Sequence, residues 1–208
     1  MMDYKSQVDP SHYLVGSYNT QDRWDSYWHQ LSMVFSKNPS TVLEVGVGGG
    51  VVTRELRSKG IVVTTLDIAQ DLKPDIVGSV TEITLPDNSV DIALAAEVIE
   101  HIRFEDVLTA LKELARVAKS HVVISIPHPG YVFLLHFKFP LLPRITLFAK
   151  IPFFWQTHNF DGQHYWELGK RSYSLRRFVN LAKEAGLSLE KNKCYPDDPV
   201  HRHLLFSV

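Results

Sequence analysis

Four residues whose types and spacing favour ligand binding alternate in one short stretch, which reads TVLEVGVGGG over residues 41–50. Glu44, Gly46, Gly48 and Gly50 stand within or directly after a run of apolar and β-branched residues. Glycine lets the backbone turn sharply and lets a ligand approach the main chain without meeting a Cβ atom. A carboxylate two residues before the first glycine suits a ligand group with positive charge. The stretch therefore predicts a buried strand that ends in a ligand-binding turn.

An acidic residue follows at the distance expected for a ribose contact. Residues 61–68 (IVVTTLDI) form a nearly continuous β-branched run that contains Asp67, 19 residues after Gly48. In nucleotide-binding βαβ units, an acid about 20 residues beyond the glycine turn accepts hydrogen bonds from ribose hydroxyls. The intervening residues 49–59 predict a helix that ends at Gly60. Together these elements predict a site for a nucleotide-type cofactor.

The glycine pattern narrows the class of cofactor. Dinucleotide-dependent enzymes carry G-x-G-x-x-G, whose backbone N–H groups face a pyrophosphate. Here Val51 stands where the third glycine would be, and Glu44 would repel an anionic diphosphate. The residues EVGVGGG at 44–50, with Asp67, resemble the class I S-adenosylmethionine-dependent methyltransferases. Residues 85–102 (LPDNSVDIALAAEVIEHI) resemble the central stretch of one large branch of that superfamily, the small-molecule methyltransferases.

The resemblance covers about residues 41–126 and implies an α/β fold. The expected architecture is a Rossmann-like, seven-stranded, mostly parallel sheet with helices on both faces and an antiparallel C-terminal hairpin. The 208 residues would form a single methyltransferase domain. We expect an N-terminal helical cover, a cofactor-binding core, an apolar insert that acts as an acceptor lid, and a C-terminal helix with the hairpin, at residues 1–40, 41–127, 128–172 and 173–208.

The same resemblance assigns roles in binding the cofactor, S-adenosyl-L-methionine. Glu44 and the backbone of the glycine turn would hold the methionine end, and Asp67 the ribose. The adenine would lie against Ile68, Ser79 and Val80, although many relatives carry an acid where this chain has Ser79. The expected cofactor-binding residues are Glu44, Gly46, Gly48, Gly50, Asp67, Ile68, Ser79, Val80 and Glu97.

The segment before the first strand would cover the cofactor. Tyr18 and Arg23 would then contact its methionine end. Five apolar residues recur at helical spacing in this segment, and we expect them to pack against the core as one stripe: Trp24, Tyr27, Trp28, Leu31 and Phe35.

Two histidines are candidates for catalysis, each with a plainer alternative. His128 lies between two prolines after the fifth predicted strand, which would hold it stiffly as a general base or as an acceptor-orienting group. His101 lies just past the fourth predicted strand and flanks the expected acceptor pocket. Either side chain would otherwise be a loop or packing residue. His201, at the start of the last predicted strand, lies near the pocket or on the surface.

The acceptor site would be lined by residues between the fifth strand and the last helix. The resemblance implies acceptor contacts from Asp161, His164, Tyr165 and Trp166. His158, Asp161 and His164 match no metal-ligand spacing, so we expect no metal. Methyl transfer to most acceptors needs none.

Residues 131–155 (YVFLLHFKFPLLPRITLFAKIPFFW) are strongly apolar but interrupted by three basic residues and three prolines. No uncharged run of 18 residues occurs, so the segment does not predict a membrane-spanning helix. It is interpreted as a lid over an apolar acceptor, with a homodimer surface and a peripheral membrane contact as alternatives.

Composition bounds the remaining function classes. A net charge of −1 and a pI near 6.8 give no basic footprint for nucleic acid, so no nucleic-acid partner is expected. Cys194 is the only cysteine and the N-terminal residues are polar, which favours a cytoplasmic location. The predicted function is transfer of a methyl group to a small or lipid-like acceptor. A non-catalytic Rossmann-like scaffold and, less favoured, an NAD-dependent oxidoreductase remain as alternatives.

Overall fold

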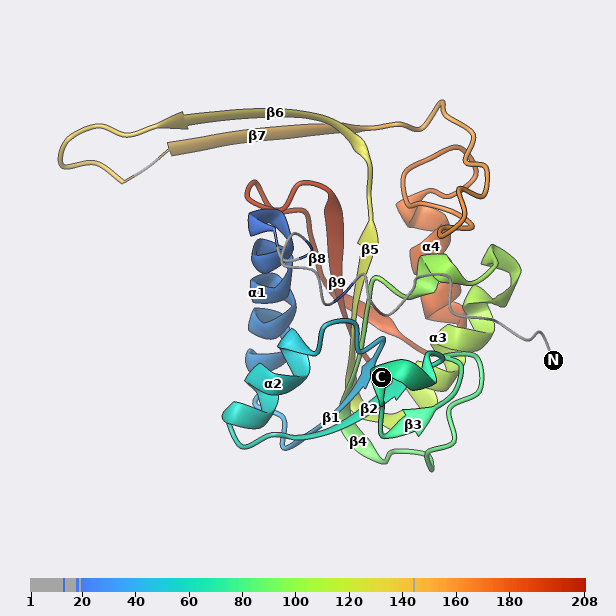
Figure 1. The fold of residues 1–208 in the computed structure, drawn as a ribbon. Coiled ribbons are helices and arrows are strands. Elements are labelled where there is room, and N and C mark those ends of the chain that lie inside the picture. Colours follow the sequence, from blue (N-terminus) through green and yellow to red (C-terminus); the bar gives the residue numbers. More distant parts are fainter. Residues whose placement is uncertain (1–12, 14–17, 19, 144) are drawn as a thin grey trace.

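The computed structural model describes residues 13, 18, 20–143 and 145–208. Within them, seven strands form one sheet in the order β3-β2-β1-β4-β5-β9-β8 (Figure 1). The strands are β1 (Thr41–Val45), β2 (Val62–Asp67), β3 (Ile76–Val77), β4 (Val90–Ala96), β5 (Ala118–Pro127), β8 (Ser188–Lys193) and β9 (His201–Ser207).

Strands β1 to β5 run parallel, while β9 is antiparallel to both β5 and β8. The expected fold is confirmed, including the C-terminal hairpin formed by β8 and β9. The chain crosses over between β1 and β4, so the carboxyl ends of these neighbouring strands form a topological switch point. Ligands of open α/β sheets bind outside such a point.

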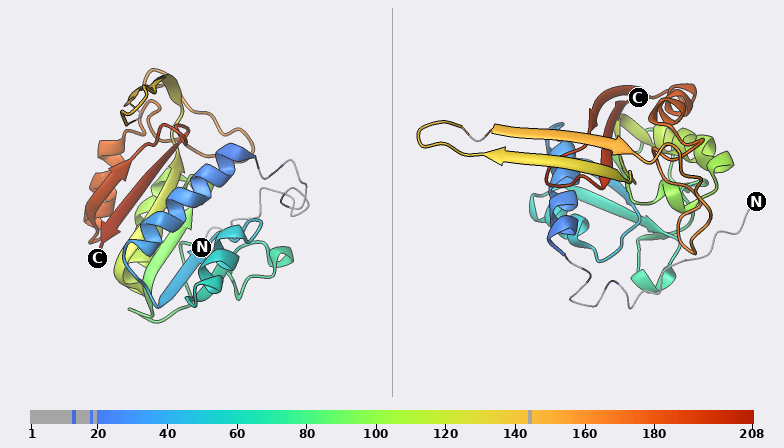
Figure 2. Two further views of the ribbon diagram at one scale, coloured as in Figure 1. Left: turned by 90° about the vertical axis from the view of Figure 1, so that its left-hand side faces the viewer. Right: turned by 90° about the horizontal axis from the view of Figure 1, so that it is seen from above.

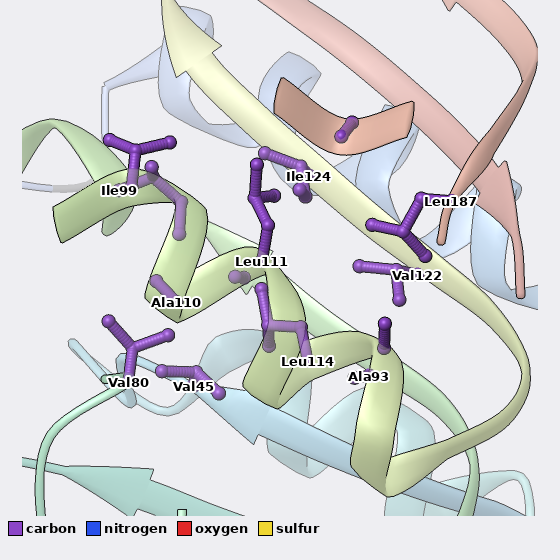
Figure 3. Packing of buried hydrophobic residues seen from close by; sticks show 14 of the residues in the cluster. Val45, Val80, Ala93, Ile99, Ala110, Leu111, Leu114, Val122, Ile124 and Leu187 are labelled. Carbon is purple, nitrogen blue, oxygen red and sulfur yellow. The ribbon is translucent and has the colours of Figure 1, made fainter. Parts of the chain in front are cut away.

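Helices cover both faces of the sheet (Figures 1 and 2). Helices α1 (Gln21–Phe35) and α2 (Val51–Ser58) lie on one face; α3 (Val107–Val117) and α4 (Leu175–Glu184) lie on the other. Short 3-10 turns η3 (Gln70–Leu72), η4 (Ile99–His101) and η5 (Phe104–Asp106) follow β2 and β4. Figure 3 shows the apolar cluster between α3 and the sheet, where Leu111 and Leu114 meet Val122 and Ile124. This packing fixes the strand ends that carry the site.

The stripe expected on α1 packs against the core only in part, through Tyr27, Leu31 and Phe35. Trp24 and Trp28 are 52% and 64% exposed, whereas Leu31 and the polar Gln30 are buried. The helix is rotated so that Tyr27 and Gln30 face a cavity at the edge of the sheet. Helical spacing showed that the aromatic residues share a face, but burial depends on what that face meets.

The apolar insert forms a second, two-stranded sheet, which sequence reading did not predict. Strands β6 (Gly130–Phe137) and β7 (Ile145–Pro152) pair antiparallel along their whole length. The hairpin projects from the end of β5 and extends past α1 (Figures 1 and 2). None of the helices in the described residues is long and apolar enough to cross a membrane.

Candidate active site

The glycine turn at the end of β1 has the backbone that only glycine adopts readily. Gly46, Gly48 and Gly50 have φ of +82°, +49° and +68°. A Cβ atom on Gly46 would lie 2.4 Å from Cγ2 of Val98, which no real structure tolerates without movement. Gly50 is also the N-cap residue of α2, so the first turn of that helix begins at the loop. The turn therefore presents backbone N–H groups to the cavity in front of it.

Glu44 is buried directly beneath this turn. The Thr53 hydroxyl, from α2, donates a hydrogen bond to its carboxylate. Burial raises the pKa of Glu44 to about 7, although Thr53 and the distant Arg57 and Arg54 oppose that shift. Because this pKa lies near neutral pH, a cation that binds beside the carboxyl group would shift it to the ionised form. Glu44 is therefore suited to a positively charged ligand, as its sequence position indicated.

Asp67 fixes the other side of the turn. One carboxylate oxygen accepts a hydrogen bond from the backbone N–H of Val47 at 2.9 Å, and the other accepts one from Ala69 at 2.8 Å. These contacts hold the carboxylate at the mouth of the cavity, at the carboxyl end of β2. Each oxygen keeps a further lone pair for a ligand hydroxyl.

Two adjoining cavities contain all nine residues predicted to bind the cofactor. The first cavity, of about 320 Å³, is lined by Glu44, the glycine turn, Asp67 and Glu97. The second cavity, of about 110 Å³, is lined by Ile68, Ser79, Val80 and apolar neighbours. Gly46, Asp67 and Glu97 line both. The polar first cavity and the more apolar second cavity thus form a continuous site of two chemical characters.

A third cavity, of about 370 Å³, opens from the same place. Tyr13 and Glu97 line all three cavities, and His101 lines the second and third. The third cavity takes its walls from five separate parts of the chain: Tyr13, Tyr18, Arg23, Glu97, His101, Pro127, Pro129, Gln163, His164, Glu167, Val200 and His201.

Glu97 is the junction of the three cavities and has an unusual backbone. Its φ of +54° lies in the left-handed region, which costs energy for a residue with a side chain. Ser125 on β5 compensates: its backbone O accepts from the Glu97 N–H, and its Oγ donates to Glu97 Oε1 at 2.7 Å. Oε2 lies 3.3 Å from Nε2 of His201. Both carboxylate oxygens are therefore positioned by neighbouring strands.

His201 belongs to a buried network of acids and histidines. Asp198, with no exposed surface, accepts from Nδ1 of His201 at 2.6 Å and from Nε2 of His203 at 2.6 Å. Burial lowers the pKa of His201, but the Glu97 and Asp198 carboxylates outweigh burial and raise it above its ordinary value. The same two bonds hold the pKa of Asp198 far below normal, against the effect of burial. The His201 ring, which lines the first and third cavities, is therefore held between two carboxylates that favour its protonated form.

His101 has the opposite electrostatic character. Burial and the neighbouring His164, whose ring centroid is 5.1 Å away, lower its pKa. Its Nδ1 lies 3.0 Å from the backbone O of Gln163. On the same wall of the third cavity, Nδ1 of His164 lies 3.2 Å from one carboxylate oxygen of Glu167. Lys170 pairs with the other oxygen of that carboxylate. The third cavity thus brings together His101, whose pKa is lowered, and His201, whose pKa is raised.

Residues 43–126 match the family model described as a methyltransferase domain. The matched residues include the glycine turn, Asp67 and β4. This match supports the superfamily, the enzyme class and the cofactor, S-adenosylmethionine, that the residues at 44–50, 67 and 85–102 indicated. No curated protein matches the chain significantly.

Solved methyltransferases share the fold over nearly the whole chain. The 1,6-didemethyltoxoflavin-N1-methyltransferase of Burkholderia thailandensis, with bound S-adenosylhomocysteine, is 15% identical, with a TM-score of 0.61 over 95% of this chain and 86% of that one. The CcbJ methyltransferase of Streptomyces caelestis is 13% identical, with a TM-score of 0.63 over 99% and 98%. The N-methyltransferase NodS of Bradyrhizobium japonicum, with bound S-adenosylhomocysteine, is 13% identical, with a TM-score of 0.58 over 91% and 88%. At these identities the likeness shows the fold.

Two of the predicted site residues are buried and line none of the three cavities. His128 is 2% exposed and lines none of the three cavities. Burial and the nearby Lys150 and Arg202 lower its pKa to about 3, so it is a neutral packing residue against Gly169. Trp166 is fully buried among aromatic rings of the core and also lines no cavity. The His128 ring, although it lies between two prolines, therefore points inward.

Of the other three predicted acceptor residues, one lines the third cavity and two line none of the cavities. His164 lines the third cavity, whereas Asp161 is exposed and stabilises the loop by accepting from the N–H groups of Gln163 and His164. Tyr165 stacks on Phe160 and lines none of the cavities. Asp161 and Tyr165 therefore shape the loop that carries His164 rather than the cavity wall.

Several lining residues were not predicted as ligand contacts, among them Tyr27, Gln30 and Val200. Tyr18 and Arg23, expected at the methionine end, do line the first cavity, and the Arg23 guanidinium lies 3.9 Å from the Tyr18 ring centroid. The sequence DPVHRH at 198–203 was the available signal for His201 and its network. An acid before two alternating histidines places both rings on one face of β9.

Proposed function

We propose that this chain transfers a methyl group from S-adenosylmethionine to a small or lipid-like acceptor held in the third cavity. The observation that carries the proposal is the position of Glu97, which borders the two cavities lined by the predicted cofactor residues and the third cavity as well. An acceptor in the third cavity would therefore adjoin the cofactor. The acceptor's polar group would face His101, His164 and His201.

The residues of the first two cavities fit the cofactor chemically. The buried Glu44 carboxyl suits its positively charged methionine end, Asp67 its ribose hydroxyls, and the second cavity its adenine. S-adenosylmethionine supplies an electrophilic methyl group bound to a sulfonium. The protein's own task is then to align the acceptor and to exclude water.

Many oxygen and nitrogen acceptors must lose a proton when they are methylated, and His101 is the group suited to take up that proton. Its lowered pKa keeps the ring neutral at pH 7, and it borders the third cavity. His201, whose two ring nitrogens face Asp198 and Glu97, would instead hold the Glu97 carboxylate in place beside the acceptor. The division of roles follows from the two environments of these rings.

Calorimetric titration with S-adenosylhomocysteine, and separately with NAD, tests the cofactor half of this proposal. We expect micromolar binding of the first and none of the second. Asp67→Ala should weaken S-adenosylhomocysteine binding at least about tenfold, because hydrogen bonds to a charged carboxylate contribute roughly 1.5–3 kcal/mol. Asp71→Ala is the matched control, since Asp71 is exposed on η3 and lines none of the cavities.

Failure of both ligands to bind would contradict the proposal and favour the scaffold. Binding of NAD alone would favour the oxidoreductase. An Asp67→Ala variant with unchanged affinity would remove Asp67 from the site while leaving the cofactor class intact.

A further inference from the structure

One face of the β6–β7 hairpin is apolar and exposed at every position. Directly paired residues of two strands share a face, as do alternate residues along each strand. Tyr131, Phe133, Leu135 and Phe137 on β6 pair with Ile151, Ala149, Leu147 and Ile145 on β7. All eight are exposed, whereas the alternate residues of β7 are partly buried. We call these eight residues the outer face.

The inner side of the hairpin is tied to the body at its base. The Lys150 ammonium donates to the backbone carbonyls of His128 and Pro199, and burial lowers its pKa. The contact joins β7 to the segments that precede β6 and β9. The hairpin therefore has a fixed root, while its outer face and its tip extend beyond α1 (Figures 1 and 2).

The tip and the root extend the apolar surface in both directions. Phe139, Leu141 and Leu142 at the tip are exposed. At the root, Phe154 and Trp155 are exposed and form an aromatic cluster with Phe153 and Tyr131. Tyr and Trp rings are favoured at membrane–water interfaces. A continuous patch of this kind marks a surface that something covers.

The charge of this segment indicates what covers it. Residues 114–160 contain no Asp or Glu, although the chain has 23 acids in total. The Lys and Arg residues within residues 130–155 are Lys138, Arg144 and Lys150. Lys150 lies at the root of the hairpin. Lys138 is exposed beside Phe139. Basic residues next to inserted apolar side chains are the pattern of segments that lie in an anionic lipid interface.

We propose that the hairpin docks this protein on an anionic lipid surface, with the tip and the outer face in the interfacial region and Lys138 at the headgroups. A second copy of the chain is the less favoured occupant. Two outer faces packed tip to tip would bring two basic turns together, and in any orientation the segment has no acid that could pair with a cation of the other copy. An anionic surface supplies the missing negative charge.

Docking by the hairpin has a consequence for the third cavity. Pro129 lines that cavity and directly precedes β6, so the root of the hairpin adjoins the cavity wall. A membrane held at the hairpin would lie on the side of the molecule from which β5 emerges. The inference itself rests on the outer face and its charge, independently of the proposed reaction.

The test is vesicle co-sedimentation of the full chain, with phosphatidylcholine vesicles and with vesicles that also contain phosphatidylserine. We expect at least about tenfold stronger partitioning onto the anionic vesicles, reduced at high salt. Leu141→Asp/Leu142→Asp at the tip and Leu135→Asp/Leu147→Asp on the outer face should each lower it at least about tenfold. Val62→Asp/Leu189→Asp adds the same charge at exposed apolar sites outside the hairpin and should lower it far less.

Thermal unfolding of each variant shows whether the sheet remains folded, and sedimentation velocity of the wild type records its oligomeric state. Absence of binding to anionic vesicles would overturn the proposal, as would partitioning that neither hairpin variant changes. A dimer that Leu135→Asp/Leu147→Asp dissociates, with no vesicle binding, would assign the outer face to a second copy. Neither result would depend on S-adenosylmethionine binding, which the calorimetric titration tests separately.

Discussion

The two ends of the proposed active site, a cofactor end at the first two cavities and an acceptor end at the third, are built in different ways. The cofactor end is local: Glu44, the glycine turn and Asp67 lie within 24 residues and two adjacent strands. The acceptor end is assembled from five separate parts of the chain. At the cofactor end, function depends mainly on backbone shape. At the acceptor end it depends on buried polar groups that must satisfy one another.

This contrast predicts different consequences of mutation. A change at the cofactor end should lower ligand affinity with a modest loss of stability. A change at the acceptor end should lower stability first, because its polar groups are buried and mutually dependent. Each of the following predictions would weaken or sharpen that distinction.

Gly46→Ala should have the largest effect. A side chain at φ +82° costs roughly 1–2 kcal/mol, and its Cβ would also lie 2.4 Å from Val98, so the turn must move. We expect S-adenosylhomocysteine affinity to fall by at least about a hundredfold, or 2.7 kcal/mol, in calorimetric titration.

Gly60→Ala is its matched control. Gly60 has a similar φ of +80°, but a Cβ there would meet nothing within 4 Å. It should lose about 1 kcal/mol of unfolding free energy and keep its affinity. Equal losses of affinity in the two variants would show that the shape of the glycine turn is not specific to binding.

Asp198→Asn should have the next largest effect, on stability. The substitution removes the charge that holds His201 and His203, and a broken buried ion pair costs about 3 kcal/mol. Asp197→Asn is the neighbouring control: Asp197 pairs with His29 at 2.9 Å, but its side chain is 57% exposed, so its loss should cost under about 1 kcal/mol. Urea unfolding measures both.

The loss of unfolding free energy in Asp198→Asn should depend on pH. The depressed pKa of Asp198 gives stability that is present above its unfolded value near 3.9 and is lost as the pH falls below it. The raised pKa of His201 gives stability that is present below about 6.5 and is lost as the pH rises through the folded value. The two variants should therefore differ more at pH 5.5 than at pH 8.5. A pH-independent difference would contradict the ionic account of this network.

The sequence predicted the cofactor end because its signals are short-ranged. Glycine spacing and an acid at a strand end need only one βαβ unit to acquire meaning, and all nine predicted residues line the two cavities. His128 and Trp166 failed because a loop residue points inward or outward according to contacts made by distant segments. Gly169, for example, leaves the space that the His128 ring occupies.

The β6–β7 hairpin shows the same limit of prediction from sequence. Residues 145–152 (ITLFAKIP) alternate aliphatic residues with Thr146, Phe148 and Lys150, but β6 is apolar at nearly every position. An alternation with a period of two residues is therefore visible in only one of the two strands. The apolar composition of the segment favoured its interpretation as a lid instead. Burial and pairing show the outer face only once both strands are placed.

Glu44→Gln should have the smallest effect and the most specific one. With a pKa of about 7, only about one Glu44 in ten is ionised at pH 6, whereas nearly all are ionised at pH 8. The cationic cofactor favours the ionised form, so wild-type affinity for S-adenosylmethionine should rise about tenfold over this range, with proton release on binding. Calorimetry in buffers of different ionisation enthalpy measures both quantities.

Glu44→Gln should lose that additional pH dependence and proton release, while Glu55→Gln, at an exposed pair with Lys59 on α2, should keep them. Titration of the ligand itself is common to all three proteins, so the difference isolates Glu44. The free energy of unfolding should change with pH in the direction opposite to the affinity. A buried carboxyl with a raised pKa destabilises the folded state as the pH rises from about 4.5 to 7, and Glu44→Gln removes that slope. Parallel pH profiles for wild type and Glu44→Gln would show that the cofactor end recognises shape alone, without the charge that its sequence predicted.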